Sequence, residues 1–386
     1  SIPLTLWPIA QSFTSSRRNQ PSLASIVFSG RDYNESSFGM ETQEEVTMKT
    51  TALIGALTVA GLSAGMASAA TLEDVQARGV LNCGVTTGVV GFASPDENGV
   101  WSGIDVSVCR AVAAAIFGDN DAIEFIPTTS KTRFTALASG EIDMLARNTT
   151  WTLSRDVDLK FEFTGINYYD GQGFLVPAEL GVSSATELDG ATVCIQTGTT
   201  TELNLADFFR ANGMSYQPVP IETNAEAQQQ YVAGACDVYT TDASALASTR
   251  ASFETPGDHV LLPEIVSKEP LGPLVRHGDN EWGDIVRWTL NALITAEELG
   301  VTSENIEELA AAPTGNPEIN RLLGTEGELG AMLGLPADWA KNAIASDGNY
   351  GEIFEKHIGE NTPIGLARGL NALWTDGGLI YSPPFR

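Results

Sequence analysis

A row of short hydroxyl and amide side chains, ending in a guanidinium, follows the run 142–145, which is apolar apart from Asp143. It contains Asn148, Thr150 and Arg155. Hydroxyls, free backbone N–H groups and the planar fork of an arginine suit a small carboxylate, because they offer paired hydrogen bonds of matched geometry. The apolar run predicts a strand, and open α/β sheets bind ligands at the carboxyl ends of their strands. The row therefore predicts a site for a small anion or zwitterion.

Two more polar segments are expected at strand ends. Thr199 and Thr200 follow the predicted strand 191–196 in a glycine-containing turn, where the start of a helix favours negative charge. Asp242 closes a later strand and supplies a negative charge that suits an ammonium. Taken alone, each segment could simply cap the following helix, and Arg155 could be an ordinary ion-pair partner. Together they describe an α-amino-acid site, with a carboxylate clamp opposite an ammonium clamp.

The elements that position these segments alternate between strand and helix, which predicts an α/β fold with parallel sheets. The pattern runs over residues 80–146 and restarts at 191–240, and extended segments flank the second run. We therefore predict a second lobe inserted in the first, joined by a two-strand hinge that permits closure. Lobe 1 is expected over 70–174 and 272–386, and lobe 2 over 175–271.

The N-terminal region predicts export. From Met48 the sequence runs through one lysine and an apolar stretch shorter than a membrane span to Ala67-Ser68-Ala69, the pattern of a secretory signal peptide. We expect a signal peptide over 48–69 with cleavage after Ala69. A buried helix is the alternative for the apolar stretch. Residues 1–47 are interpreted as a non-native or disordered extension without function.

The composition is strongly acidic, with a formal net charge of −28 over 386 residues. Such a surface repels phosphate backbones and anionic lipid, which argues against binding to nucleic acid or membrane surfaces. Beyond the predicted signal peptide, the apolar runs are shorter than a membrane helix requires. We therefore expect an exported protein that is free in its compartment, monomeric and without a nucleic-acid partner.

The chain has four cysteines, an even number that favours disulfides in an exported protein. Two lie early and two late, each pair within one predicted lobe, so we predict the pairs Cys83–Cys109 and Cys194–Cys236. Four buried thiols are the alternative. A zinc site is not expected, because the sequence has three histidines and no close Cys-x-x-Cys.

The combination of motifs resembles the periplasmic amino-acid-binding proteins of ABC transporters, solute-binding protein family 3, and more closely their general L-amino-acid subgroup. The resemblance covers 70–386, and its carrying segments are 146–152, 196–200, 239–242 and 376–386. It implies a two-lobed type II fold, capture of L-amino acids with broad specificity in the cleft between the lobes, and delivery to a membrane permease in the periplasm. It implies no cofactor and no metal.

The resemblance also implies roles for individual residues. Arg155 would grip the α-carboxylate with help from Thr150 and Thr200, and Asp242 would take the α-ammonium. The chain departs from many relatives at Thr86, which stands where they carry an acidic residue. Arg147 also departs, because narrower relatives have a small serine there. We interpret both departures as a shift toward neutral and acidic ligand side chains and away from strongly cationic ones.

An enzyme on the same scaffold, a lyase similar to prephenate or arogenate dehydratases, is the first alternative. Such a reaction needs a positioned general acid, and Asp242 already has a ligand-binding role. The sequence contains no His-Glu-x-x-His and no Walker loop. An extracellular sensing domain, the second alternative, would need a membrane anchor or a fused output domain, which we do not expect. We therefore predict a transport protein that is not an enzyme.

Overall fold

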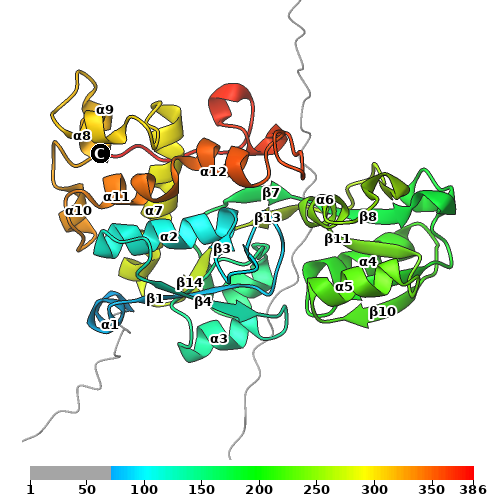
Figure 1. Ribbon diagram of the computed structural model, residues 1–386. Coiled ribbons are helices and arrows are strands. Elements are labelled where there is room, and N and C mark those ends of the chain that lie inside the picture. The colour runs from blue at the N-terminus through cyan, green and yellow to red at the C-terminus, as the bar shows by residue number, and fades with distance from the viewer. Residues whose placement is uncertain (1–70) are drawn as a thin grey trace, which may run out of the picture. The chain divides into compact units, whose positions relative to one another are not determined.

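The computed structural model describes residues 71–386, which form two five-stranded sheets with helices packed on them (Figure 1). The predicted signal peptide and the extension 1–47 lie outside the described residues. None of the described helices is both long and apolar enough to cross a membrane. The predicted α/β class is confirmed by this architecture.

The first sheet has the strand order β4-β1-β5-β14-β6. Its parallel part joins β1 (Leu81–Thr86) to β4 (Ile123–Thr128) and to β5 (Met144–Leu145). The strand β14 (Leu274–Arg276) completes the sheet by pairing antiparallel with β5 on one side and with β6 (Phe161–Phe163) on the other. The strands β5 and β6, which lie on either side of β14, come before the second sheet in the sequence, whereas β14 comes after it. The second sheet is therefore inserted within the first.

The second sheet repeats the plan with the order β10-β9-β11-β8-β12. The strands β10 (Gln217–Ile221) and β11 (Val238–Asp242) flank β9 (Thr192–Gln196) in parallel. At the other edge, β8 (Gln172–Pro177) pairs antiparallel with β11, and β12 (His259–Leu261) pairs antiparallel with β8. The carboxyl ends of β9 and β11 thus carry the polar turns predicted to bind ligand.

We call each sheet with its helices a lobe. The helices of the first lobe are α1 (Thr71–Arg78), α2 (Ile104–Phe117), α3 (Arg133–Ser139), α7 (Asn280–Glu298), α8 (Ile306–Ala310), α9 (Pro317–Leu322), α10 (Leu329–Met332), α11 (Trp339–Asp347) and α12 (Tyr350–His357). Those of the second lobe are α4 (Thr200–Ala211), α5 (Asn224–Val232) and α6 (Ala243–Ala251). A small hairpin of β2 (Ser94–Pro95) and β3 (Trp101–Ser102) precedes α2.

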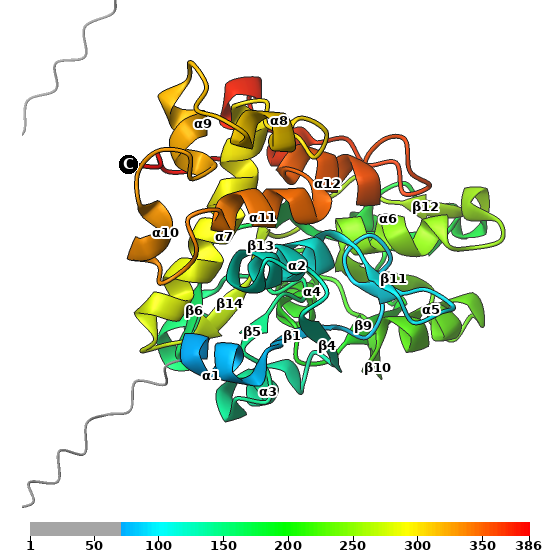
Figure 2. The same ribbon diagram turned by 60° about the vertical axis from the view of Figure 1, so that its left-hand side comes forward.

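Helix α2 is apolar around most of its circumference, as expected of a buried helix. It ends at Gly118, whose φ of 67° lies in the left-handed region that favours glycine. Helices α7 and α11 lie beside α2 and enclose it over the first sheet (Figure 2). The C-terminal region therefore contributes to the core of the first lobe, where Phe354 and Phe385 are buried with β1 residues such as Leu81.

Two strands connect the lobes. The chain leaves the first lobe through β7 (Tyr168–Asp170) and returns through β13 (Glu269–Leu271), and these two strands pair antiparallel (Figure 1). The predicted inserted lobe and two-strand hinge are thus confirmed as architecture. The lobe boundaries at 174/175 and 271/272 stay predictions, the first of them falling inside β8.

Both predicted disulfides are confirmed. Cys83–Cys109 joins β1 to α2 across a sequence separation of 26 residues. Cys194–Cys236 joins β9 to the turn before β11 across 42 residues. Each bridge therefore ties a parallel strand to an element of its own lobe, and neither restricts motion of one lobe against the other.

The crossings approach each other closely at Gly272. A Cβ atom at this position would lie 1.9 Å from the backbone oxygen of Gly165. We predict that Gly272→Ala lowers the free energy of unfolding by about 1–3 kcal/mol, because overpacking forces the backbone to shift. Urea denaturation measures the change. Gly315→Ala is the control, since a Cβ there meets nothing within 4 Å, and equal stabilities of the two variants would contradict the prediction.

Candidate ligand-binding site

A cavity of about 30 Å³ lies where polar turns of the two lobes meet. Its lining is Thr86, Val89, Arg147, Asn148, Gln196, Asn224, Thr241, Asp242 and Ala245. Thr86, Gln196 and Asp242 are the last residues of β1, β9 and β11. The cavity therefore sits at the carboxyl ends of parallel strands, where α/β sheets commonly bind ligands.

Only some of the residues predicted for the site line this cavity. Thr86, Arg147, Asn148 and Asp242 line the cavity, whereas Thr150, Thr199, Thr200 and Arg155 do not. The first group includes the predicted ammonium partner and both departures from the family pattern. The second group contains the whole of the predicted carboxylate clamp apart from Asn148.

Asp242 is the buried acidic residue of the cavity. It precedes α6, yet its side chain makes no capping hydrogen bond with the start of that helix. Burial raises the pKa of its carboxyl well above 3.8, and the neighbouring Asp170 and Glu269 raise it further. The positive charges of Arg133 and Arg155 act in the opposite direction. A ligand cation would stabilise the ionised form of Asp242, which is the chemistry expected of an ammonium site.

Arg147 and Asn148 form the opposite wall. Arg147 is buried and donates from Nε to the Thr128 carbonyl oxygen at 3.2 Å and from Nη2 to Ser130 Oγ at 3.1 Å. Burial lowers the pKa of its guanidinium to about 10. The backbone N–H of Asn148 donates to Asp105 Oδ2 at 3.0 Å. Both polar atoms of the Asn148 amide are buried without a partner among the described residues, which favours a ligand that pairs them.

Thr150 and Thr200 meet from opposite lobes, with their hydroxyl oxygens 3.3 Å apart. Both hydroxyls donate to the carboxylate of Glu269, and the Thr200 bond is 2.8 Å long. The resemblance implied that these hydroxyls serve the ligand. In the described arrangement their protons are committed to a carboxylate of the protein itself.

Thr199 and Arg155 have other partners. Thr199 caps α4, because its hydroxyl accepts a 3.1 Å hydrogen bond from the Glu202 backbone N–H. This is the capping role that the sequence left open. Arg155 is buried, donates to the Thr150 carbonyl oxygen at 2.8 Å and lies 5.3 Å from the centre of the Phe134 ring. Burial lowers the pKa of Arg155 to about 10.

Arg133 and Glu269 were missed by the sequence analysis. Arg133 is 2% exposed and donates to Thr149 Oγ1 at 3.2 Å, and its Nε has no partner within the described chain. Burial lowers the pKa of Arg133 well below its usual value, and the positive charge of Arg147 lowers it further. The hydroxyl-rich segment 128–132 at the end of β4 is the signal that could have identified this region. Glu269 offered no comparable signal, because it lies alone in an extended segment.

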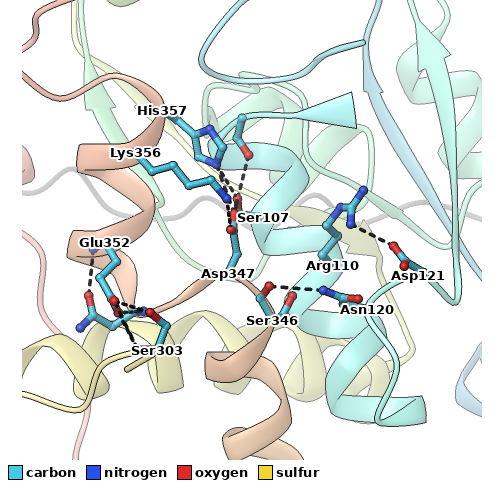
Figure 3. Close-up of polar contacts among 12 residues, drawn as sticks. Ser107, Arg110, Asn120, Asp121, Ser303, Ser346, Asp347, Glu352, Lys356 and His357 are labelled. Carbon is cyan, nitrogen blue, oxygen red and sulfur yellow. Dashed lines mark hydrogen bonds and ion pairs between the residues drawn. The ribbon is translucent and has the colours of Figure 1, made fainter. Parts of the chain in front are cut away.

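A second polar cluster lies away from the cavity, among α2, α11 and α12 (Figure 3). Ser107 Oγ lies 3.0 Å from His357 Nε2, and Asp347 Oδ2 lies 3.2 Å from the same nitrogen. In a hydrolytic triad the serine and the carboxylate use different nitrogens of the imidazole. This cluster therefore lacks triad geometry. Asp347 also accepts hydrogen bonds from Ser107 and Lys356, so it ties three helices together.

Comparison with known proteins gives one consistent family. The model of the bacterial extracellular solute-binding proteins, family 3, matches residues 81–305. The glutamate/glutamine/aspartate/asparagine-binding protein BztA of Rhodobacter capsulatus is 63% identical, over 88% of this chain and 100% of that protein. The general L-amino acid-binding periplasmic protein AapJ of Rhizobium johnstonii is 56% identical, over 87% of this chain and 98% of that protein.

A solved structure is also similar. It is an ABC transporter periplasmic binding protein from Brucella ovis with glutathione bound, with a TM-score of 0.80 and 56% identity. The match covers 82% of this chain and 99% of that one. The similarity thus extends over both lobes and both crossings.

The contribution of Asp347 to the free energy of unfolding should depend on pH. Burial raises the pKa of Asp347, but hydrogen bonds from His357, Lys356 and Ser107 lower it to about 2. Its stabilising contribution is therefore present above pH 3.8 and is lost as the pH falls toward 2. We expect Asp347→Asn to cost about 1–2 kcal/mol of unfolding free energy at pH 6, after allowance for solvent screening, and nothing near pH 2.

Denaturant melts at pH 6, 4, 3 and 2 measure this difference. Ser107→Ala should reduce the same pH dependence only in part, because it removes one of the three side-chain partners of Asp347. A difference between wild type and Asp347→Asn that stays constant from pH 6 to pH 2 would contradict the assignment.

Proposed function

The chain belongs to the bacterial extracellular solute-binding proteins, family 3, and on this premise we propose that it captures L-amino acids between its lobes for a membrane permease of an ABC transporter in the periplasm. The observation that carries the proposal is the buried carboxyl of Asp242 in a cavity whose opposite wall holds Arg147 and the Asn148 amide, which has no partner among residues 71–386. An amino acid complements such a pair of walls, because its ammonium meets the carboxyl of Asp242 and a neutral or anionic side chain meets Arg147 and the Asn148 amide.

We assign the α-ammonium to Asp242. We assign the α-carboxylate to Arg155, with Thr150 and Thr200 as hydroxyl donors. Thr150 and Thr200 meet at the junction of the lobes, Arg155 donates to the Thr150 carbonyl oxygen, and Arg155 is close enough to Asp242 to affect its pKa. The ligand's side chain would then extend toward Arg147 and Thr86.

Capture requires movement of the lobes. A cavity of about 30 Å³ has room for about two water molecules, which is less than any amino acid needs. Contacts such as the 3.3 Å hydrogen bond from Asn224 Nδ2 to the Gly88 carbonyl oxygen close the cavity from both lobes. The paired crossings β7 and β13 are the place where the lobes would rotate apart, and the ligand favours closure through contacts made with both lobes.

The charges around the cavity favour neutral and acidic side chains. Arg133 and Arg147 are both buried near it. A cationic side chain placed about 4 Å from a guanidinium would be disfavoured by about 4 kcal/mol at an effective dielectric constant of 20. The relative BztA is named as a binding protein for two acidic amino acids and their amides, which supports this preference.

The alternative of a cleft lyase receives no support from the site. The relatives with high identity are binding proteins, and the acidic group of the cavity, Asp242, has the position of a ligand-charge partner. We therefore propose that the chain releases its ligand unchanged.

Ligand preference can be tested with the full set of common L-amino acids. We expect glutamate, aspartate, glutamine and asparagine to raise the melting temperature, since a ligand that binds only the folded state stabilises it. Calorimetry should give dissociation constants at least about tenfold lower for these four than for arginine or lysine. Glutathione belongs in the panel because a similar protein holds it. Tighter binding of arginine or lysine than of glutamate would refute the assigned preference.

The two charge partners can be tested separately. Arg155→Ala and Asp242→Asn should each weaken glutamate binding by about 2–5 kcal/mol, because each leaves one ligand charge without its buried partner. Asp242→Asn should also raise the melting temperature of the ligand-free protein, since burial disfavours the ionised carboxyl. Asp207→Asn, which alters an exposed carboxylate paired with Arg210, should change neither quantity. Wild-type affinity in both site variants would disprove the residue assignments.

A further inference from the structure

Glu269 joins the two lobes through its carboxylate. It lies on the returning crossing β13 and is 1% exposed. Its Oε2 accepts from Thr150 of the first lobe and from Thr200 of the second. Its Oε1 accepts from Asn204 and from Ser267, each at 2.7 Å. Four donors from both lobes and from the hinge therefore converge on one buried carboxylate.

Thr150 and Thr200 have too few hydroxyl protons to serve both Glu269 and a ligand. A threonine hydroxyl has a single proton, so it donates one hydrogen bond at a time. Thr150 and Thr200 donate theirs to Glu269, yet they are the hydroxyls that the proposed function assigns to the ligand's α-carboxylate. The ligand and Glu269 cannot both receive these protons. Both are anions drawn to the same positive charge, since Arg155 interacts electrostatically with Glu269.

We propose that Glu269 is an internal competitor of the ligand's α-carboxylate: it occupies the hydroxyl donors of Thr150 and Thr200, latches the lobes together, and gives up these donors when an amino acid binds. This inference rests on the proposed function and adds an element of regulation to the same site. The latched protein holds a carboxylate where the ligand's carboxylate must go. Binding therefore begins from the fraction of molecules in which the latch is open.

The latch lowers the apparent affinity for every ligand in the same proportion. If Glu269 holds the donors for about nine-tenths of the time, the apparent dissociation constant is about ten times the intrinsic one. A competitor of this kind acts on the α-carboxylate that all amino acids share. It leaves the discrimination between side chains, which we place at Arg147 and Thr86, unaffected.

The test compares Glu269→Gln with wild type by calorimetry against glutamate and by small-angle X-ray scattering without ligand. An amide removes the competing charge, so we expect about tenfold tighter binding and a larger radius of gyration in the ligand-free protein. Glu222→Gln is the matched control. It removes another contact between the lobes, the ion pair with Lys131, without touching Thr150 or Thr200, and should not tighten binding.

A second variant protects the test against misfolding of Glu269→Gln. Asn204→Ala removes one 2.7 Å donor of Glu269 from the second lobe and should tighten binding about two- to threefold by weakening the latch. Unchanged or weaker glutamate binding in whichever of these two variants folds would overturn the proposal and mark Glu269 as a strut of the hinge. Failure of the wild type to bind any amino acid would instead refute the proposed function, and the scattering comparison would still decide whether Glu269 latches the lobes.

Discussion

The burial of Asp242 is the constraint on which the rest of the site depends. A carboxylate removed from water favours its neutral form, and two further carboxylates nearby add to the cost. The arginines that surround it compensate in part, but each is itself buried and loses hydration. The arrangement is therefore a set of charges that the protein leaves incompletely paired. Such a set is best satisfied by a molecule that brings one positive and one negative charge of its own.

The two lobes place these charges in the same way. In each lobe the parallel strands end at the cavity, so Thr86 of the first lobe and Asp242 of the second arrive on facing sides. The crossings β7 and β13 keep the two sides in register, and the contact between Gly165 and Gly272 shows how little space separates the neighbouring segments. The disulfides lie within the lobes and do not cross this junction. Stiff lobes and a junction held only by non-covalent contacts are what a protein needs if ligand binding is to be coupled to closure.

Local patterns were sufficient to predict the sheets, the disulfides and the positions of some residues that line the cavity. Asp242 and Asn148 could be placed because the carboxyl ends of parallel strands converge, whatever the details of packing. Thr199 could not, since a threonine before a helix is equally suited to a ligand and to a cap, and only the bond to the Glu202 N–H distinguishes them. Glu269 was beyond reach for another reason. Its partners Thr150 and Thr200 come from distant parts of the chain, and the contact exists only when both lobes meet.

The position of the arginines also bears on how a chain of such negative charge would attract the acidic ligands that we propose. A net charge of −28 opposes the approach of an anion at long range. At about 0.1 M salt, however, charges more than roughly 10 Å apart are largely screened. Within that distance of the cavity the anion meets Arg133, Arg147 and Arg155, whose burial shields them from counterions far more than exposed groups are shielded. On the function that we propose, the buried guanidinium groups would therefore decide which ligands the cavity accepts, and the acidic surface would act mainly at longer range.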